Sequence, residues 1–329
     1  MRVLFNTYPV AFDCPGGGEI QLLKSKQALE ALGVEVLLFD PWRPQFDRVD
    51  LVHYFSVQGG SMNFCDYVKR LSLPLVISPV VWLTVENRRQ FPLGEIRDLL
   101  SLCDRILPNS RAETEQLADE FHLDREKFSV VPNGIDEDFA LVADPQIARR
   151  RFELPEEFIL NVANVERRKN QLLLARVAAE MNRDLVLVGN VRDQEYLQAC
   201  LTAGGDRVRY LGHLAHSDPA LKSLYRACRV FALPSLLETP GLAALEAAAQ
   251  GARIVVTEVG AAPEYFGPGA EYVEPADAAG LRKAIDAQWH APAVDTLRRR
   301  VVENFTWPHA GKALVEAYER TLLAVASVC

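Results

Sequence analysis

The sequence has no apolar run approaching the ~18 residues that a membrane-spanning helix requires. It also has no charged segment followed by a long apolar run near Met1, so we expect neither a signal peptide nor a transmembrane segment. The six cysteines are scattered, and no two of them have the spacing of a zinc site or a redox motif. We therefore expect reduced thiols, no bound metal and a cytoplasmic protein.

An excess of positive charge is also missing. The 329 residues carry a formal net charge of −8, and residues 1–140 hold 14 basic against 21 acidic side chains. This acidic first part argues against a nucleic acid as partner, and it gives no support to peripheral contact with an anionic membrane. The chain is 49% hydrophobic and 24% charged, as globular proteins are, and it is long enough for two domains.

Apolar, β-branched segments alternate with amphipathic segments along the chain. This alternation predicts βαβ units and therefore an α/β protein with doubly wound parallel sheets, whose ligands bind at the carboxyl ends of the strands. The expected strands are Val3–Asn6, Val34–Phe39, Leu51–Phe55, Leu75–Ser78, Ile106–Pro108, Ser129–Val131, Phe158–Asn164, Asp184–Gly189, Val208–Gly212, Arg229–Pro234, Ala252–Thr257 and Glu271–Val273.

The segment from Val230 to Phe266 carries the main functional signal. It predicts a strand, a polar turn, a helix and a second strand. Thr239 fits an N-cap and Pro240 fits the first helical position, so we expect the helix to begin at Pro240. The amides of Gly241 and Leu242 would then point out of the positive end of the helix dipole, an arrangement that favours an anion such as phosphate.

Two acids bracket this turn. Glu238 lies just outside the predicted helix, and Glu246 lies inside it, between one and two turns further on. A carboxylate in the second turn can reach a pair of hydroxyls but would repel a phosphate, so the two acids should have different roles. Spacing alone favours the simpler interpretation of a surface acid and an ordinary helical glutamate, because most helical glutamates are solvated.

Glu238-Thr239-Pro240-Gly241, with seven residues separating Glu238 from Glu246, resembles the paired-glutamate motif of GT4, a large family of retaining glycosyltransferases with the GT-B fold. The resemblance spans nearly the whole chain and is strongest in its second half. It implies two Rossmann-like doubly wound domains facing a central cleft. It also implies transfer of a sugar from a nucleotide diphosphate sugar to an acceptor hydroxyl, with retention and without a metal or other cofactor.

The resemblance further implies a division of labour between the domains. Residues 1–140 would form the acceptor-side domain and residues 141–304 the donor domain, and a helix at about 305–329 would cross back onto the first domain. The expected acceptor is a saccharide, a glycolipid or a small molecule, in the synthesis of a glycan, a polysaccharide or a glycolipid. The donor base, the sugar and the linkage stay open.

Family roles can be carried over to matching positions in the second half. Glu246 would bind the ribose of the donor, and Glu238 would lie at the sugar and the diphosphate. The segment Thr239-Pro240-Gly241-Leu242 would hold the phosphate through its free amides, and the loop at Gly212 would hold the base. Lys169 matches a lysine that neutralises the departing diphosphate.

The arginine that accompanies this lysine in relatives is missing, because Asn164 occupies its place. Arg167 or Arg168 would have to substitute for it, and without a substitute the leaving group would be less well stabilised. Basic residues beside a helix start are poor partners for the helix dipole unless an anion lies there.

Two features of the first half belong to the same resemblance. Gly16, Gly17 and Gly18 would by themselves mean a flexible loop, whereas in relatives such a loop faces the donor diphosphate. A lone histidine at a strand end, as at His53, is more often structural than catalytic. Relatives nevertheless place a histidine there beside the acceptor, often in a His-x-His pair whose second member is Phe55 in this chain.

These departures keep other functions open. A non-catalytic nucleotide-sugar-binding partner, or a regulatory subunit of an active transferase, would fit Asn164 and Phe55. An epimerase or a phosphorylase would share the architecture, although a phosphorylase would be expected in a much longer chain. Asp136–Asp138 resembles a metal-binding Asp-x-Asp of another glycosyltransferase fold, but we expect a solvated charged segment there.

Overall fold

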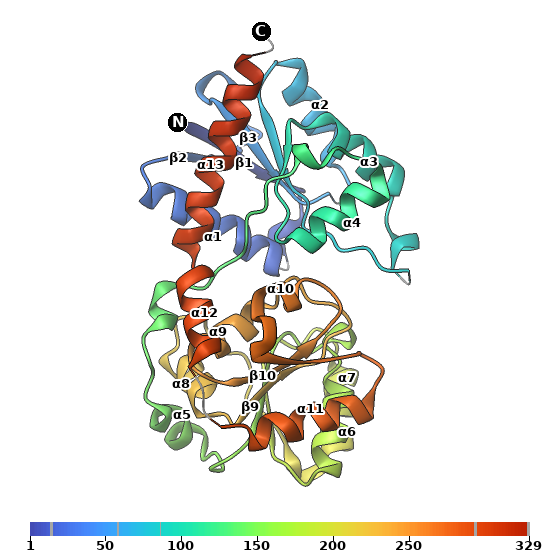
Figure 1. Ribbon diagram of the computed structural model, residues 1–329, viewed down its shortest axis with the longest axis vertical. Coiled ribbons are helices and arrows are strands. Elements are labelled where there is room, and N and C mark those ends of the chain that lie inside the picture. Colours follow the sequence, from blue (N-terminus) through green and yellow to red (C-terminus); the bar gives the residue numbers. More distant parts are fainter. Residues whose placement is uncertain (14–15, 58, 86, 293–294, 328–329) are drawn as a thin grey trace. The chain divides into compact units, whose positions relative to one another are not determined.

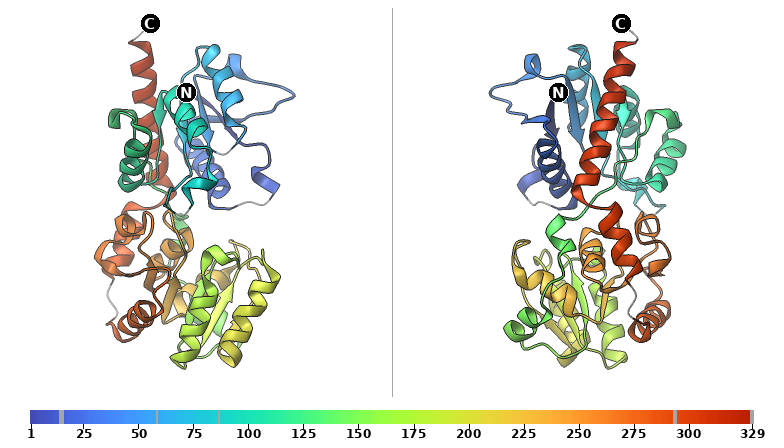
Figure 2. Two further views of the ribbon diagram at one scale, coloured as in Figure 1. Left: turned by 90° about the vertical axis from the view of Figure 1, so that its right-hand side faces the viewer. Right: turned by 60° about the vertical axis from the view of Figure 1, so that its left-hand side comes forward.

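The computed structural model describes residues 1–13, 16–57, 59–85, 87–292 and 295–327. The chain divides into two compact units, one formed by Met1–Gly134 with Trp307–Cys329 and the other by Ile135–Thr306. Each unit is a parallel sheet covered by helices (Figures 1 and 2). The predicted α/β class with two parallel sheets is confirmed. None of the helices in the described part of the chain is long and apolar enough to cross a membrane.

The first unit is built on a five-stranded sheet in the order β2-β1-β3-β4-β5, with every pair parallel. Its strands are β1 (Arg2–Thr7), β2 (Glu35–Leu38), β3 (Leu51–Phe55), β4 (Leu75–Ser78) and β5 (Arg105–Ile106). Its helices are α1 (Gly17–Ala31), α2 (Ser61–Arg70), α3 (Leu93–Leu102), α4 (Arg111–Phe121) and α13 (Trp307–Ala326). Strands β3 and β4 are buried at every residue, as expected for strands with helices on both faces.

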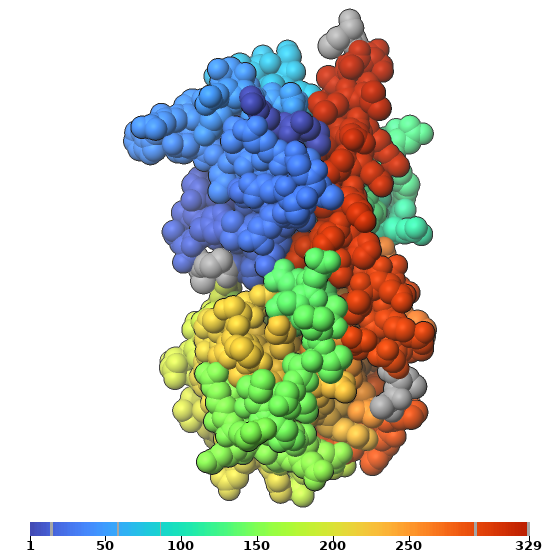
Figure 3. All heavy atoms as spheres, turned by 90° about the vertical axis from the view of Figure 1, so that its left-hand side faces the viewer, coloured from blue at the N-terminus to red at the C-terminus, as the bar shows by residue number. Residues whose placement is uncertain are grey.

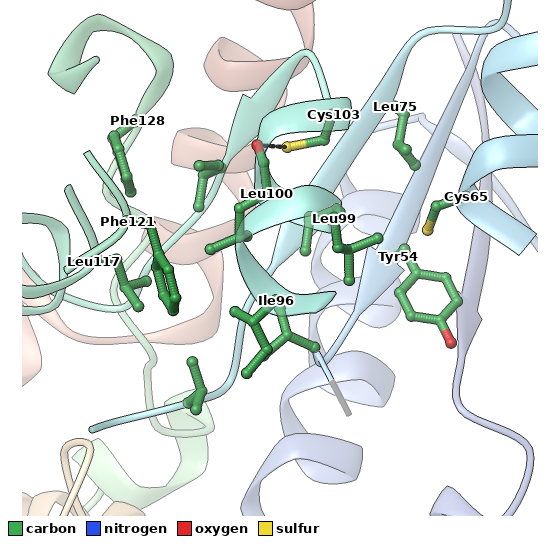
Figure 4. Packing of buried hydrophobic residues seen from close by; sticks show 14 of the residues in the cluster. Tyr54, Cys65, Leu75, Ile96, Leu99, Leu100, Cys103, Leu117, Phe121 and Phe128 are labelled. Carbon is green, nitrogen blue, oxygen red and sulfur yellow. Dashed lines mark hydrogen bonds between the residues drawn. The ribbon is translucent and has the colours of Figure 1, made fainter. Parts of the chain in front are cut away.

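A core in the first unit joins α2, α3 and α4 to the sheet (Figure 4). Tyr54 and Leu75 from the sheet lie near Leu99 of α3 in this cluster. Cys103 also belongs to it, and its Sγ donates to the Leu100 carbonyl oxygen at 3.3 Å. Burial raises the pKa of the Cys103 thiol to about 12, so this cysteine stays protonated and packs as a small core residue.

Helix α13 belongs to the first unit although it ends the chain. It lies against α1, where a Cβ at Gly311 would be only 3.0 Å from the Ala28 Cβ, so the two backbones approach closely (Figures 1 and 3). Arg105 of β5 also donates to Thr321 Oγ1 at 3.2 Å. Because these contacts fix it to the sheet and to α1, α13 completes the first unit's helical cover.

The second unit is built on a six-stranded parallel sheet in the order β11-β10-β9-β6-β7-β8. Its strands are β6 (Ile159–Val162), β7 (Leu185–Val188), β8 (Val208–Tyr210), β9 (Val230–Leu233), β10 (Arg253–Thr257) and β11 (Ala270–Val273). Its helices are α5 (Pro145–Phe152), α6 (Gln171–Glu180), α7 (Gln194–Gly204), α8 (Pro219–Ala227), α9 (Leu242–Ala249), α10 (Ala262–Phe266), α11 (Ala278–His290) and α12 (Thr296–Asn304). The chain builds outward from β6 through β7 and β8, then returns to place β9 on the other side of β6. The strand order therefore reverses between β6 and β9, and the carboxyl ends of these two strands form the switch point at which such sheets bind ligands.

Two local predictions are wrong. Ser129–Val131 does not form a strand, although Ser129 N and Val131 N donate to the carbonyl oxygens of Ile106 and Pro108, each at 2.9 Å. Helix α1 begins at Gly17, within the segment expected to be a glycine loop, because the Glu19 carboxylate accepts from the Gly16 amide and caps the helix end. Gly17 and Gly18 are therefore helical, and only Gly16 of the three glycines precedes the helix.

Candidate functional site

The segments that follow β6 and β9 are tied to each other at the switch point. Leu236 N donates to the Arg168 carbonyl oxygen at 2.9 Å. Asn170 Nδ2 donates to the Pro234 carbonyl oxygen at 3.0 Å, and the backbone of Asn170 is left-handed, with φ at 58°. These bonds hold the turn that carries Lys169 against the turn that carries Glu238.

Lys169 and Glu238 form an ion pair there. Lys169 Nζ lies 2.5 Å from Glu238 Oε1, and the two side chains are only 13% and 6% exposed. Burying two charges is costly unless they are paired, so each side chain depends on the other. An ammonium has three donors, and the contact with Glu238 takes one of them, so further donors of Lys169 can serve an anion.

The backbone of Glu238 is fixed by the segment after β10. Glu238 N donates to the Val259 carbonyl oxygen at 3.1 Å, and its own carbonyl oxygen accepts from Ala261 N at 3.0 Å. Gly260 crosses so closely that a Cβ there would lie 2.0 Å from the Glu238 carbonyl oxygen, and its φ is +116°. This position therefore requires glycine.

The turn after Glu238 corrects the predicted helix start. Thr239 and Pro240 lie in the turn, joined by a cis peptide bond, and α9 begins at Leu242 with Gly241 as its N-cap. Gly241 has φ at 89°, outside the helical region, so the helix cannot include it. The first hydrogen bonds of the helix run from Ala244 N and Leu245 N to the Gly241 carbonyl oxygen. The amides that precede this ladder are those of Leu242 and Ala243, one residue further along than predicted.

Glu246 lies one turn into α9 and is 7% exposed. Its Oε2 accepts from the Tyr225 hydroxyl at 2.9 Å, and its Oε1 lies 2.7 Å from His216 Nε2. Burial and the neighbouring carboxylate raise the pKa of Tyr225 well above its usual range, so Tyr225 remains a donor. Each carboxylate oxygen has a second lone pair, so Glu246 can accept from a hydroxyl pair while it keeps both contacts.

Neither His216 nor Tyr225 was predicted from the sequence. Tyr225 lies in α8 among apolar residues, and its spacing is that of an ordinary core position. His216 lies in the loop between β8 and α8, which begins near Gly212. Gly212 has φ at +82°, and its carbonyl oxygen accepts from Gly189 N at 3.0 Å. The expected base-binding loop and the expected ribose carboxylate therefore meet through His216.

Asn164 follows β6, and a guanidinium lies against it. With its amide oxygen facing that group, Asn164 accepts from Arg192 Nε at 3.1 Å and from Nη2 at 3.2 Å. Arg192 also lies 3.4 Å from Glu166, which Arg168 contacts at 3.1 Å. Arg167 points elsewhere, toward Asp193 and the ring of Tyr196. The guanidinium beside Asn164 thus comes from Arg192, from the loop after β7, and not from the two arginines that the sequence suggested.

In the first unit, the structure gives His53 a structural role. It is completely buried, with Nδ1 2.6 Å from the Tyr318 hydroxyl and Nε2 2.9 Å from Ser78 Oγ. Its ring stacks on Phe55 with a centroid distance of 4.0 Å. Burial lowers the pKa of His53 to about 3, so the ring is neutral. His53 thus ties β3 and β4 to α13, and these contacts favour a structural role over the catalytic one that the resemblance implies.

The glycine segment of the first unit is held from within that unit. Gly16 N donates to Glu19 Oε2 at 2.6 Å, and the Tyr8 hydroxyl donates to Glu19 Oε1 at 3.1 Å. A Cβ at Gly18 would lie 3.0 Å from Val80 Cγ1, whereas a Cβ at Gly17 would have no neighbour within 4 Å. Of Gly17 and Gly18, it is therefore Gly18 at which a larger residue would crowd a neighbour, the Val80 side chain.

The acidic run at Asp136–Asp138 is not gathered around a common point. Asp136 Oδ2 lies 3.5 Å from His216 Nδ1, while Asp138 pairs with Lys222 at 2.6 Å. Within the residues that the structure describes, no group of three or more His, Cys, Asp or Glu side chains could hold a metal ion.

Comparison with known proteins matches both parts of the chain to sequence families. Residues 144–306 match the family Glycosyl transferases group 1, and residues 45–139 match Glycosyltransferase Family 4. D-inositol 3-phosphate glycosyltransferase of Mycolicibacterium smegmatis is 28% identical over 246 residues, which are 70% of this chain and 56% of that protein. The MMP alpha-(1->4)-mannosyltransferase of Mycolicibacterium hassiacum is 29% identical over 68% of this chain and 55% of that protein. The chain thus spans about half the length of these two curated relatives.

Solved structures share the fold. Sucrose-phosphate synthase from Thermosynechococcus elongatus superposes with a TM-score of 0.83 at 21% identity, covering 98% of this chain and 99% of that one. Anabaena HepE in complex with UDP superposes with a TM-score of 0.78 at 20% identity, covering 97% and 100% of the two chains.

Proposed function

Because the chain belongs to the glycosyl transferases of group 1, we propose that it moves a sugar from a nucleoside diphosphate sugar to an acceptor hydroxyl, with retention at the anomeric carbon. The second unit binds the donor and the first unit binds the acceptor. The observation that carries the proposal is the buried Lys169–Glu238 pair at the carboxyl ends of β6 and β9, with the buried Glu246 one turn into the helix that follows β9.

The diphosphate would be held by charges and amides of the second unit. Lys169 offers the ammonium donors that Glu238 does not take, and the amides of Leu242 and Ala243 stand at the positive end of α9. Arg168 and Arg192 together contact one carboxylate, Glu166, so this side of the site carries an excess of positive charge. Stabilising the departing diphosphate is the chemistry such groups provide, and it acts by position and electrostatics.

The nucleoside would be oriented by Glu246. Its carboxylate is buried and already oriented by Tyr225 and His216, so it can accept from two ribose hydroxyls with little loss of side-chain entropy. The sugar would then lie near Glu238. The acceptor hydroxyl attacks from the face that the diphosphate leaves, and the anomeric configuration is retained.

The acceptor supplies the hydroxyl that attacks the anomeric carbon. We propose a saccharide, a glycolipid or a small molecule, in the synthesis of a glycan, a polysaccharide or a glycolipid. UDP is the first nucleotide to test, since HepE, which shares the fold, was solved in complex with UDP and with UDP-glucose.

Calorimetric titration of the protein with UDP, GDP, ADP and TDP in turn tests the donor site. We expect one nucleotide to bind the wild-type protein, with a loss of at least tenfold in Glu246→Ala, because a buried acceptor for two hydroxyls is removed. Glu195→Ala, an exposed glutamate of α7, is the matched control and should bind normally. Failure of every nucleotide at millimolar concentration, or equal binding by Glu246→Ala, would contradict the proposal.

A nucleotide that binds without turnover would instead favour the non-catalytic partner. The feature that keeps this alternative open is Asn164, which places an amide where relatives have a guanidinium. If the protein is a non-catalytic partner, Lys169→Met should release nucleotide at the same background rate as the wild type. If it is a transferase, Lys169→Met should lose most of the wild-type activity.

A further inference from the structure

His216 connects the proposed ribose carboxylate to the segment that opens the second unit. Its Nε2 lies 2.7 Å from Glu246 Oε1, and its Nδ1 lies 3.5 Å from Asp136 Oδ2. The ring packs against Phe139 with a centroid distance of 5.0 Å. About half of the side chain is exposed, so the imidazole can exchange protons with solvent.

The two protonation states of this ring make different contacts. A protonated imidazole donates from both nitrogens, and can therefore serve Glu246 and Asp136 at once. A neutral imidazole that donates to Glu246 from Nε2 turns the lone pair of Nδ1 toward the Asp136 carboxylate. The site therefore holds the ring more firmly when it is charged than when it is neutral.

Two other ionisable side chains lie close to the ring or to its partners, Tyr225 and Lys222. Tyr225 stays protonated, because burial and Glu246 raise its pKa well above the usual range. Lys222 lies over the Phe139 ring at 5.5 Å and pairs with Asp138. Histidine is the side chain that ordinarily changes charge between pH 5 and 8, so His216 is the group here that can respond to a shift in that range.

We infer that His216 is a positioning residue for the nucleoside, and that its protonation weakens nucleotide binding. The neutral ring orients Glu246 and leaves the full negative charge of the carboxylate to accept from ribose hydroxyls. The charged ring neutralises that carboxylate and makes it a poorer acceptor. This inference rests on the proposed function, because it concerns the same carboxylate.

Calorimetric titration with UDP at pH 7.5 and pH 5.5 tests the inference. His216→Gln keeps a neutral donor for Glu246 at both pH values, so it should bind UDP at pH 7.5 about as well as the wild type. Between the two pH values the wild type should lose about tenfold more affinity than the variant, the size of a hydrogen bond to a charged group. Comparing the two proteins cancels the ionisation of UDP itself.

Two further variants separate this role from a general effect of the loop. His213→Gln replaces an exposed histidine of the same loop and should keep the wild-type pH dependence. Asp136→Asn removes one of the two carboxylates that favour the charged ring, so its loss of affinity should begin at a lower pH.

Equal pH dependence in the wild type and His216→Gln would overturn the inference while the donor site stands. A loss of UDP binding in His216→Gln at pH 7.5, with the fold intact by circular dichroism, would also overturn it, since a neutral donor would then not suffice. An absence of UDP binding by the wild type at either pH would overturn both the inference and UDP as the nucleotide.

Discussion

Replacing Lys169 by methionine should destabilise the second unit, because it leaves the Glu238 carboxylate buried without a cation. The pair is 13% and 6% exposed, with Nζ and Oε1 2.5 Å apart. Breaking a buried pair by removing one partner costs about 3–5 kcal/mol in the free energy of unfolding. The pair lies at the carboxyl ends of β6 and β9 and is not completely buried, so we expect the loss of unfolding free energy to be about 3 kcal/mol, or roughly 150-fold in the unfolding equilibrium.

Removing both charges should cost much less. Methionine at 169 and glutamine at 238 keep the volume of the two side chains while removing both desolvation penalties, so the double variant should lose only about 1 kcal/mol. The singles and the double variant together form a cycle, and the coupling free energy should be about 2–3 kcal/mol. Urea unfolding followed by circular dichroism and tryptophan fluorescence measures it, since Trp289 reports on the second unit.

An exposed pair of the same unit is the control. Arg207 pairs with Asp184 at 3.1 Å, with side chains 42% and 32% exposed. Arg207→Met should cost less than about 1 kcal/mol, as exposed pairs do. If Lys169→Met costs no more than this control, and if the substitutions at 169 and 238 add without coupling, Lys169 and Glu238 do not stabilise the second unit as a buried pair.

Two further predictions concern the backbone and the pH dependence of stability. Gly260→Ala should displace the Glu238 turn, because a Cβ there would lie 2.0 Å from the Glu238 carbonyl oxygen, and nucleotide affinity should fall more than tenfold. Gly205→Ala is the control: Gly205 also has a positive φ, but a Cβ there would have no neighbour within 4 Å, so nucleotide binding should be unchanged. His53 takes up a proton near pH 6.5 when unfolded but only near pH 3 when folded, so its contribution to stability is present above pH 6.5 and is lost as the pH falls toward 3. The difference in unfolding free energy between the wild type and His53→Gln should therefore rise by up to about 1.4 kcal/mol per pH unit from pH 4 to 6 and then level off, and a flat difference in urea titrations would contradict the assigned burial.

Much of the fold could be predicted because buried parallel strands are short apolar runs with breaks between them. Leu51–Phe55 and Leu75–Ser78 were predicted with their observed bounds. The family resemblance is confirmed as well. Ser129–Val131 does not form the predicted strand because β5, the strand beside which it would pair, is only two residues long, so the hydrogen bonds between the two segments do not form a regular ladder.

The site was harder to predict because its contacts come from tertiary structure. The start of α9 was wrong because the left-handed backbone of Gly241 overrides the signal of Pro240 at a helix start. Arg192 meets Asn164 only because β7 lies beside β6, and His216 meets Glu246 only because the loop after β8 reaches α9. Neither contact leaves a spacing signal in the sequence. The burial of His53 could not be predicted, because a lone histidine in an apolar strand has the same sequence pattern whether its ring is catalytic or buried.

We propose that the second unit holds a nucleoside diphosphate sugar for transfer with retention. The most direct measurement is proton NMR of the anomeric signals after incubation with an α-linked nucleotide sugar and a mixture of saccharide acceptors, with Lys169→Met in parallel. We expect a new α-glycoside and one equivalent of released nucleoside diphosphate, both nearly absent with the variant. A β-glycoside would contradict retention, and nucleotide sugar that is bound but left intact would contradict transfer itself.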